Sequence, residues 1–142
     1  MADRPVVNFN FKVEWGGTRI GFQEVSGLKM ENEVLEYREG SSKDYSTTKI
    51  PGLTKYSNIT LKRGIFLGDN ELYDWWKTVH DSEFRKDIII SQLNGSFEPI
   101  IVYKIRSAWP VKFESSNLNA IHSGIAIESL EITHEGILIE HF

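Results

Sequence analysis

The sequence predicts a mainly β fold of two packed antiparallel β-sheets, a sandwich or barrel, with one α-helix and one extended β-hairpin arm. Three observations support this prediction. Apolar and polar residues alternate in several short runs, turn-forming residues separate these runs, and a single segment has helical spacing. The 142 residues fit one domain with its own core, and no repeat or linker divides them. We therefore predict a single domain over residues 1–142.

The amino-terminal part predicts a β-hairpin. Every second residue from Phe9 to Trp15 is apolar, which is the pattern of a strand with one buried face. Gly16 and Gly17 follow, and they suit a tight turn because glycine accepts positive φ without strain. The return strand contains Ile20 and Phe22.

The next segment predicts a long two-stranded arm. A strand candidate near Glu31 to Arg38 leads into a polar stretch, Gly40 to Ile50, and Pro51-Gly52 marks a further turn. The adjacent apolar residues Val34 and Leu35 leave the buried face of the first strand undecided and are compatible with a β-bulge. We expect the arm to span about residues 31–62, with a tip at about 41–53 that is mobile in isolated subunits.

The strand that follows has one apolar and one polar face. Ile59 and Leu61 point to one side, so Asn58, Thr60 and Lys62 point to the other. This polar face suits contact with water.

One helix is expected from about Asn70 to Asp81. The residues with helical spacing at i, i+3, i+4 and i+7 are Leu72, Trp75, Trp76 and Val79. Asp69 is a suitable N-cap. The paired tryptophans could form a carbohydrate platform, but their spacing favours a place in the core.

The carboxyl-terminal half predicts several more strands. Ile88 to Ile90 and Ile100 to Ile105 are strand candidates joined by Asn94-Gly95, which favours a type I′ turn, and Ala108 to Pro110 is expected to end the second strand.

In the last predicted strand, Ile125 and Ile127 share one phase whereas Leu130 and Ile132 share the other, which predicts a bulge or sheet crossing at Glu128-Ser129. The chain ends in an apolar tail, and an apolar terminus packs on its own core or on a neighbour. Its expected contact residues are Ile137, Ile139 and Phe142.

Metal and catalytic sites are not indicated. The chain has no cysteine, and its four histidines (His80, His122, His134 and His141) lack the spacing of zinc ligands. No nucleophile elbow or phosphate-binding loop occurs. The acidic cluster Glu31, Glu33, Glu36 and Glu39 could be an acid–base site, but it fits a solvated strand face better because no partner is evident. We expect no enzyme activity, cofactor or metal.

Charge and hydropathy limit the partners further. A formal charge of −4 gives no electrostatic argument for nucleic-acid binding, although a polymer could still slide through a neutral or acidic conduit. No apolar run is long enough to span a membrane, and Met1 to Pro5 does not begin a secretory signal. We therefore expect no direct membrane insertion and assembly in the cytoplasm without a cleaved signal.

A set of short motifs, weak singly, becomes specific in its order and spacing. The motifs are Gly21–Leu28, Glu36–Gly40, Lys49–Gly52, Lys55–Gly64, Trp75–Trp76, Ala108–Lys112, Leu118–Ala120, Ala126–Glu131 and His134–Gly136. Together they resemble the inner-tube proteins of phage-like contractile injection systems, a family similar to contractile-phage tail-tube proteins and to the type VI secretion tube protein. The resemblance runs from about Asn8 to Gly136.

This resemblance implies a structural protein of the tail-tube fold. Subunits of the family form six-membered rings that stack into a hollow tube, and neighbouring strands join into a continuous barrel around the lumen. A contractile sheath surrounds the tube, a baseplate nucleates it, a spike sits at its tip and a terminator caps it. Sheath contraction drives the tube through a target envelope and releases protein cargo. The particle is either released from the cell or anchored in it.

The resemblance also implies roles for particular residues. The hairpin arm reaches toward the adjacent ring, and its predicted contact residues are Ser41, Ser42, Lys43, Asp44, Tyr45, Lys49, Pro51 and Leu53. Asn58, Thr60 and Lys62 are predicted to line the lumen.

Three alternatives remain open at this point. The chain could be the tube initiator at the baseplate or a phage tail tube that conducts DNA, because these share the fold. A ligand-binding β-barrel would need an apolar interior cavity, which the polar face of Asn58, Thr60 and Lys62 argues against if it faces inward. An enzyme would depend on the acidic cluster described above.

Overall fold

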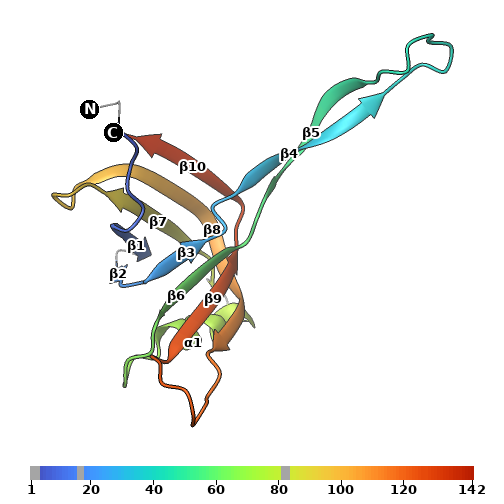
Figure 1. Cartoon of the computed structure of the whole chain (residues 1–142). Coiled ribbons are helices and arrows are strands. Elements are labelled where there is room, and N and C mark those ends of the chain that lie inside the picture. The colour runs from blue at the N-terminus through green and yellow to red at the C-terminus, as the bar shows by residue number, and fades with distance from the viewer. Residues whose placement is uncertain (1–3, 16–17, 81–83) are drawn as a thin grey trace.

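The computed structural model describes residues 4–15, 18–80 and 84–142, and it is mainly β (Figure 1). The helical segments are α1 (Glu71–Lys77) and the 3₁₀ turn η1 (Thr78–His80). The strands are β1 (Phe11–Trp15), β2 (Thr18–Ile20), β3 (Glu24–Ser26), β4 (Met30–Tyr37), β5 (Thr48–Tyr56), β6 (Ile59–Gly64), β7 (Lys86–Leu93), β8 (Pro99–Ser115), β9 (Ile127–Thr133) and β10 (Gly136–His141).

Two antiparallel sheets share the long strand β8. Its first half pairs with β7 and β10, and β7 pairs with β1 and β1 with β2, which makes sheet A. Its second half pairs with β9, followed by β6 and β3, which makes sheet B. Between the halves, Ser107 has a φ of 52° and the register shifts between Pro110 and Lys112. The prediction that the strand ends at Ala108 to Pro110 is therefore wrong, because the strand continues past an irregularity at this point.

The core lies between the two sheets. Sheet A contributes Val13, Trp15, Ile88, Ile90 and Ile105, and sheet B contributes Ile59, Leu61, Leu130 and Ile132. Helix α1 adds Leu72 and Trp75, and the Trp75 ring lies 4.8 Å from that of Trp15. This is the packed two-sheet architecture that the alternating sequence predicts.

Some predicted boundaries differ from the observed ones. The apolar alternation in the sequence begins at Phe9, but Phe9 lies before β1 and is 73% exposed. The face of β1 that packs on the core begins at Phe11. Helical structure runs from Glu71 to His80 within the described range, and Trp76 stays exposed while Val79 is half-buried. The predicted turn at residues 16–17 and the predicted helix end at residue 81 lie outside the described residues.

The turn between β7 and β8 is longer than a type I′ turn. The Asn94 amide donates to the Glu98 carbonyl at 3.0 Å, and positive φ occurs at Phe97. The Asn94 side chain accepts hydrogen bonds from the amides of Ser96 and Glu98. The type I′ prediction is therefore wrong, because the Asn94 side chain stabilises a wider loop than the Asn-Gly pair suggests.

The arm is formed by β4 and β5 and projects away from the two sheets (Figure 1). A register shift between Asn32 and Val34 confirms the expected bulge, and Val34 and Leu35 are both exposed. The arm is shorter at its carboxyl end than the predicted range of about 31–62, because β6 pairs with β9 and β3 within the body and buries Ile59 and Leu61.

The strand β9 is regular where a bulge was predicted. Its pairing with β6 runs without a shift from Ile132 to Ile127, and Ile125 precedes the strand and is 80% exposed. The prediction of a phase switch at Glu128-Ser129 is therefore wrong. Glu128 is buried in phase with Leu130 and Ile132, and its charge concealed the continuous pattern.

The connection into the arm depends on a glycine. Gly27 has a φ of +92°, and a Cβ built there would lie 2.1 Å from the Asn58 carbonyl oxygen. We predict that Gly27→Ala destabilises the subunit by at least about 1–3 kcal/mol, the usual cost of strained backbone. Gly21→Ala is the matched control, since a Cβ there meets no atom within 4 Å. Urea unfolding checks this, and equal stability of the two variants would contradict it.

Candidate functional site

Sheet B presents a polar surface on the side away from the core. Alternation in β6 buries Ile59 and Leu61 and turns Thr60 and Lys62 outward. The registers place side chains of β3, β9 and the second half of β8 beside them. We call this surface the polar face, and its residues are Glu24, Ser26, Asn58, Thr60, Lys62, Lys112, Glu114, Ser129 and Glu131.

Four of the five charged side chains of the polar face form two ion pairs within it. Lys62 lies 3.6 Å from Glu24, and Lys112 lies 3.7 Å from Glu114. Glu131 accepts a hydrogen bond of 2.9 Å from the Asn58 side chain, which places Asn58 on this face with Thr60 and Lys62. Exposed pairs of this kind contribute little to stability. They do neutralise the surface, so the face is hydrophilic without a strong net field.

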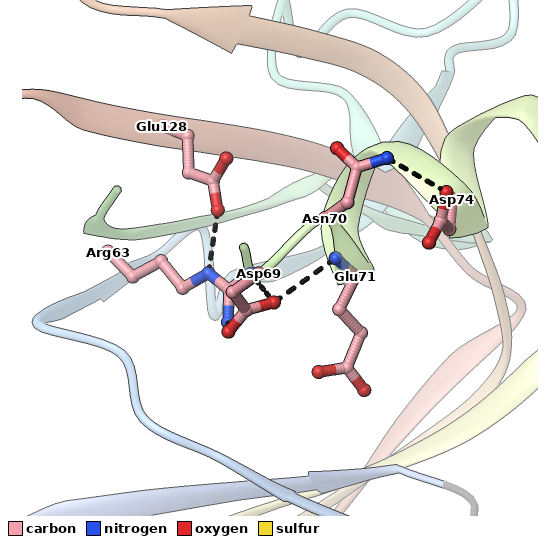
Figure 2. Close-up of polar contacts among 6 residues, drawn as sticks. All are labelled: Arg63, Asp69, Asn70, Glu71, Asp74 and Glu128. Carbon is pink, nitrogen blue, oxygen red and sulfur yellow. Dashed lines mark hydrogen bonds and ion pairs between the residues drawn. The ribbon is translucent and has the colours of Figure 1, made fainter. Parts of the chain in front are cut away.

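A buried ionic network lies on the opposite side of sheet B (Figure 2). The Arg63 guanidinium donates from Nε to Glu128 at 2.7 Å and from Nη1 and Nη2 to Asp69 at 3.2 and 3.0 Å. Arg63 is 5% exposed and Glu128 is 6% exposed. Asp69 also accepts a hydrogen bond of 3.2 Å from the Glu71 amide at the start of α1. Asp69 therefore caps the helix through this bond, although Asn70 occupies the N-cap position itself.

The hydrogen bonds of this network shift the pKa values of Arg63 and Asp69. Burial disfavours the charged guanidinium, but hydrogen bonds to Glu128 and Asp69 outweigh that effect and raise the pKa of Arg63 above its ordinary value. The hydrogen bond from the Glu71 amide, helped by Arg63, lowers the pKa of Asp69 below its ordinary value against a smaller effect of burial. Both shifts favour the ionised pair, which ties β6, β9 and the loop before α1 together.

The arm tip is closed by its own hydrogen bonds. Arg38 donates to the carbonyls of Asp44 and Ser42 at 3.0 and 2.9 Å, and its guanidinium lies 5.3 Å from the Tyr45 ring centre. The Asp44 carboxylate accepts from the Ser46 amide, and this bond lowers the pKa of Asp44. Of the predicted contact residues, Ser42 is half-buried, while Ser41, Lys43, Asp44, Tyr45, Lys49, Pro51 and Leu53 are exposed.

The acidic cluster of β4 does not form a catalytic pair. Glu31 lies opposite Lys55 and Glu36 lies opposite Lys49 in the arm, so each carboxylate faces a lysine across the ribbon. Glu33 packs beside Gly52 at the bulge. This arrangement is that of a solvated strand with cross-strand charge pairs.

The carboxyl-terminal residues form β10 along β8. Ile137 packs against the core, whereas Ile139 and Phe142 are exposed at 43% and 78%. The apolar tail is therefore only partly used within the subunit, and its outer residues are available to a neighbour.

Sequence reasoning missed the Arg63 network and the polar residues of β8 and β9. Glu128 could have been found, because it alternates with Leu130 and Ile132. Lys112 and Glu114 were missed because the strand was expected to end at Pro110.

Neither metal binding nor a membrane span is supported by the part of the chain that the structure describes. Its His, Asp and Glu side chains form no cluster of three or more that could hold a metal ion. None of the helical segments in residues 4–15, 18–80 and 84–142 has the length and apolar character of a membrane-spanning helix.

The family of the chain follows from its match to a protein-family model. The model of the T4-like virus tail tube protein gp19 matches residues 7–138. The chain belongs to this tail-tube family. The family is one of structural tail-tube proteins.

Solved tail-tube structures share the fold. One of them is a protein in the PVC sheath-tube complex of an extracellular contractile injection system in the extended state. The two chains are 29% identical and superpose with a TM-score of 0.90, and the match covers 99% of this chain and 95% of the other. Another is a protein of the anti-feeding prophage cap, which is 27% identical to this chain with a TM-score of 0.90. That match covers 99% of this chain and 93% of the other.

More distant likenesses extend to type VI secretion. Hcp1 from Flavobacterium johnsoniae is 18% identical, with a TM-score of 0.59 and coverage of 94% and 97%, and this likeness concerns the fold alone. A comparison with curated protein sequences found no match.

The buried network generates a stability prediction for this tail-tube protein. Arg63→Met leaves Glu128 buried without its partner, and we expect a loss of about 3–5 kcal/mol in the free energy of unfolding. Lys62→Met, on the neighbouring residue, removes only the exposed pair with Glu24 and should cost about 0–1 kcal/mol. Denaturant unfolding of dilute subunits measures both, and a loss from Lys62→Met as large as that from Arg63→Met would refute the assigned role of the network.

Proposed function

We propose that the chain is the inner-tube subunit of a contractile injection system. In this proposal, six subunits close into a ring, rings stack into a rigid hollow tube, and sheath contraction drives the tube through a target envelope. The support is the family match together with the 29% identity, over 99% of this chain, to a protein of the PVC sheath-tube complex. The tube acts as a conduit and performs no catalysis.

The main structural support for the proposal is the polar face, because it is a hydrophilic surface on a sheet whose edge strands are unpaired on one side. In the part of the chain that the structure describes, sheet B ends at β3 on one side, and the second half of β8 pairs only with β9. Free strand edges invite pairing with another chain. A ring in which the β3 edge of one subunit pairs with the β8 edge of the next uses both edges and places the polar face around a lumen. Asn58, Thr60 and Lys62 then line that lumen together with the rest of the polar face.

The arm serves the contact between rings. An isolated two-stranded ribbon is marginally stable in water, so β4 and β5 gain stability when their exposed side chains meet another subunit. Of the residues that were predicted to make this contact, Ser41 to Tyr45 lie in the loop at the far end of the arm, whereas Lys49, Pro51 and Leu53 lie along β5 (Figure 1). In this proposal the tip is mobile in an isolated subunit despite its internal hydrogen bonds, and it becomes ordered between rings.

The tail completes the lateral contact. Ile139 and Phe142 are exposed on and after β10, and a neighbouring subunit in the ring can cover them together with Ile137. Burial of such side chains is the main favourable term in subunit association.

The further partners follow from the tail-tube relatives. The similar structures come from a sheath-tube complex and from a tube-terminating cap, which supports a contractile sheath and a terminator as partners of this tube. A baseplate with its tube initiator and a spike would start the assembly, and protein cargo would occupy the lumen. Subunits assemble in the cytoplasm and become part of a phage tail-like particle that is released or remains anchored.

Electron microscopy of the purified protein tests the proposal. The expected result is rings with a central hole and, at higher concentration or with a baseplate extract, stacked tubes. Native mass spectrometry should show six subunits in each ring. Protein that stays monomeric under all of these conditions would contradict the proposal.

Deleting the arm tip separates the ring from the stack. We expect that removal of residues 42–48 leaves rings of normal mass but prevents long tubes, because the lateral edges of sheet B are intact while the tip loop of the inter-ring contact is lost. Ring mass and tube length are measured on the same samples, so the ring is the internal control. Tubes of normal length from the deletion would refute the role of the arm tip.

A further inference from the structure

The loop between β7 and β8 places a reactive asparagine in a defined environment. Among the asparagines of the chain, only Asn94 is followed by a glycine. Asn94 is half-buried at the start of the loop, and Gly95 is exposed. Because glycine has no Cβ, its backbone nitrogen approaches the side chain of the preceding residue without obstruction. The pair therefore has the sequence that favours cyclisation of an asparagine onto the backbone.

Two backbone amides point at the oxygen of the Asn94 carboxamide. The Ser96 amide donates to Oδ1 at 2.9 Å, and the Glu98 amide donates to the same atom at 3.0 Å. Nucleophilic attack on Cγ turns this oxygen into an oxyanion. Two preorganised amides at such distances stabilise an oxyanion, as they do in acyl-transfer enzymes. The loop therefore stabilises the charge that develops when the Asn94 side chain is attacked.

The backbone nitrogen of Gly95 is the neighbouring nucleophile. The backbone hydrogen bonds of the loop are donated by the amides of Asn94 and Phe97, to the carbonyls of Glu98 and Asn94 at 3.0 Å each. These bonds do not engage the Gly95 amide. A Cβ built on Gly95 would meet no atom within 4 Å, so the surroundings of this nitrogen are open. The nucleophile and the polarised carboxamide therefore belong to one short, ordered loop.

The loop between β8 and β9 supplies an internal comparison. The Asn119 carboxamide also accepts two backbone hydrogen bonds, from the Ile121 amide at 2.9 Å and from the His122 amide at 3.3 Å. The residue after Asn119 is Ala120, whose Cβ obstructs the attacking nitrogen. The two asparagines therefore share the contacts to the carboxamide oxygen and differ in the residue that supplies the nucleophile.

We propose that Asn94 is a site of spontaneous covalent modification by cyclisation and deamidation. The Gly95 nitrogen bonds to Asn94 Cγ, its proton passes through water to Nδ2, and the Cγ–Nδ2 bond breaks to release ammonia. The product is a succinimide. Water then opens the ring at either carbonyl and leaves aspartate or isoaspartate at position 94. Nothing is oxidised or reduced, and the only co-reactant is water.

The two products affect the loop differently. The Asn94 side chain contributes to the loop through Oδ1, and a carboxylate accepts the same two hydrogen bonds more strongly. Aspartate therefore preserves the loop and adds a negative charge near Glu98. Isoaspartate lengthens the backbone by a methylene, which displaces the Phe97 amide from the carbonyl at position 94. The Phe97 side chain, which is 69% exposed on a backbone with a φ of 59°, then loses its fixed position.

Mass spectrometry of the intact folded protein tests the proposal without any assembled tube, so the result is independent of the proposed function. Purified protein is incubated at mildly alkaline pH, and peptides that contain Asn94 or Asn119 are scored for exchange of NH₂ for OH. Chromatography separates the aspartate and isoaspartate forms. We expect modification of Asn94 to be at least several-fold faster than that of Asn119. Equal rates at the two sites would overturn the proposal.

The same measurement in urea separates the effect of the structure from that of the sequence. Unfolding removes the Ser96 and Glu98 amides from Oδ1 but leaves the Asn-Gly pair intact. We expect Asn94 to react faster in the folded protein than in the unfolded chain, because only the folded loop stabilises the oxyanion. A slower reaction in the folded protein overturns the proposal.

A single substitution identifies the nucleophile. Gly95→Ala adds a Cβ that meets no atom within 4 Å, and Gly95 does not have a positive φ, so the loop is retained. We expect modification of Asn94 to become several-fold slower while the free energy of urea unfolding is unchanged. Gly124→Ala, another site at which a Cβ meets no atom within 4 Å, is the matched control and should leave the rate unchanged. Gly95→Ala protein that is modified as fast as the unsubstituted protein would indicate direct hydrolysis and overturn the proposal.

Discussion

The ionic contact of Arg63 with Glu128 and Asp69 is the constraint on which the arrangement of the molecule depends. A guanidinium that is 5% exposed cannot lose either carboxylate without a large desolvation cost. Its pairing with Glu128 fixes which side of β9 faces inward, and hence that Ser129 and Glu131 face outward. Its pairing with Asp69 fixes the start of α1, whose Leu72 and Trp75 fill the core. The contact therefore helps to orient the polar face of sheet B.

The periodicity of apolar residues was sufficient to predict which faces of β1, β6 and α1 are buried. The alternation in β1 and β6 gave the buried faces, and helical spacing gave the face of α1 that carries Leu72 and Trp75. Features that depend on distant residues were not predictable in this way. The strand β8 continues past Pro110 because β9 pairs with it, and β9 remains regular because Arg63 neutralises a buried glutamate. Neither partner is near in sequence.

The candidate surfaces were predicted to different extents. The polar residues of β6 and the existence of the arm followed from alternation and from the family resemblance. The remaining polar-face residues came from strand registers, which a sequence does not display. The exposed Leu67, Leu118 and Ile121 lie in loops without any period, where apolar residues give no directional signal.

We propose that the polar face of sheet B surrounds an enclosed lumen. The most direct measurement is the reactivity of single engineered cysteines toward a bulky polymer-linked maleimide, before and after tube assembly. We expect that Lys62→Cys reacts in isolated subunits and is protected in tubes, while Leu138→Cys, on sheet A, reacts in both states. Full reactivity of Lys62→Cys in intact tubes would contradict an enclosed lumen.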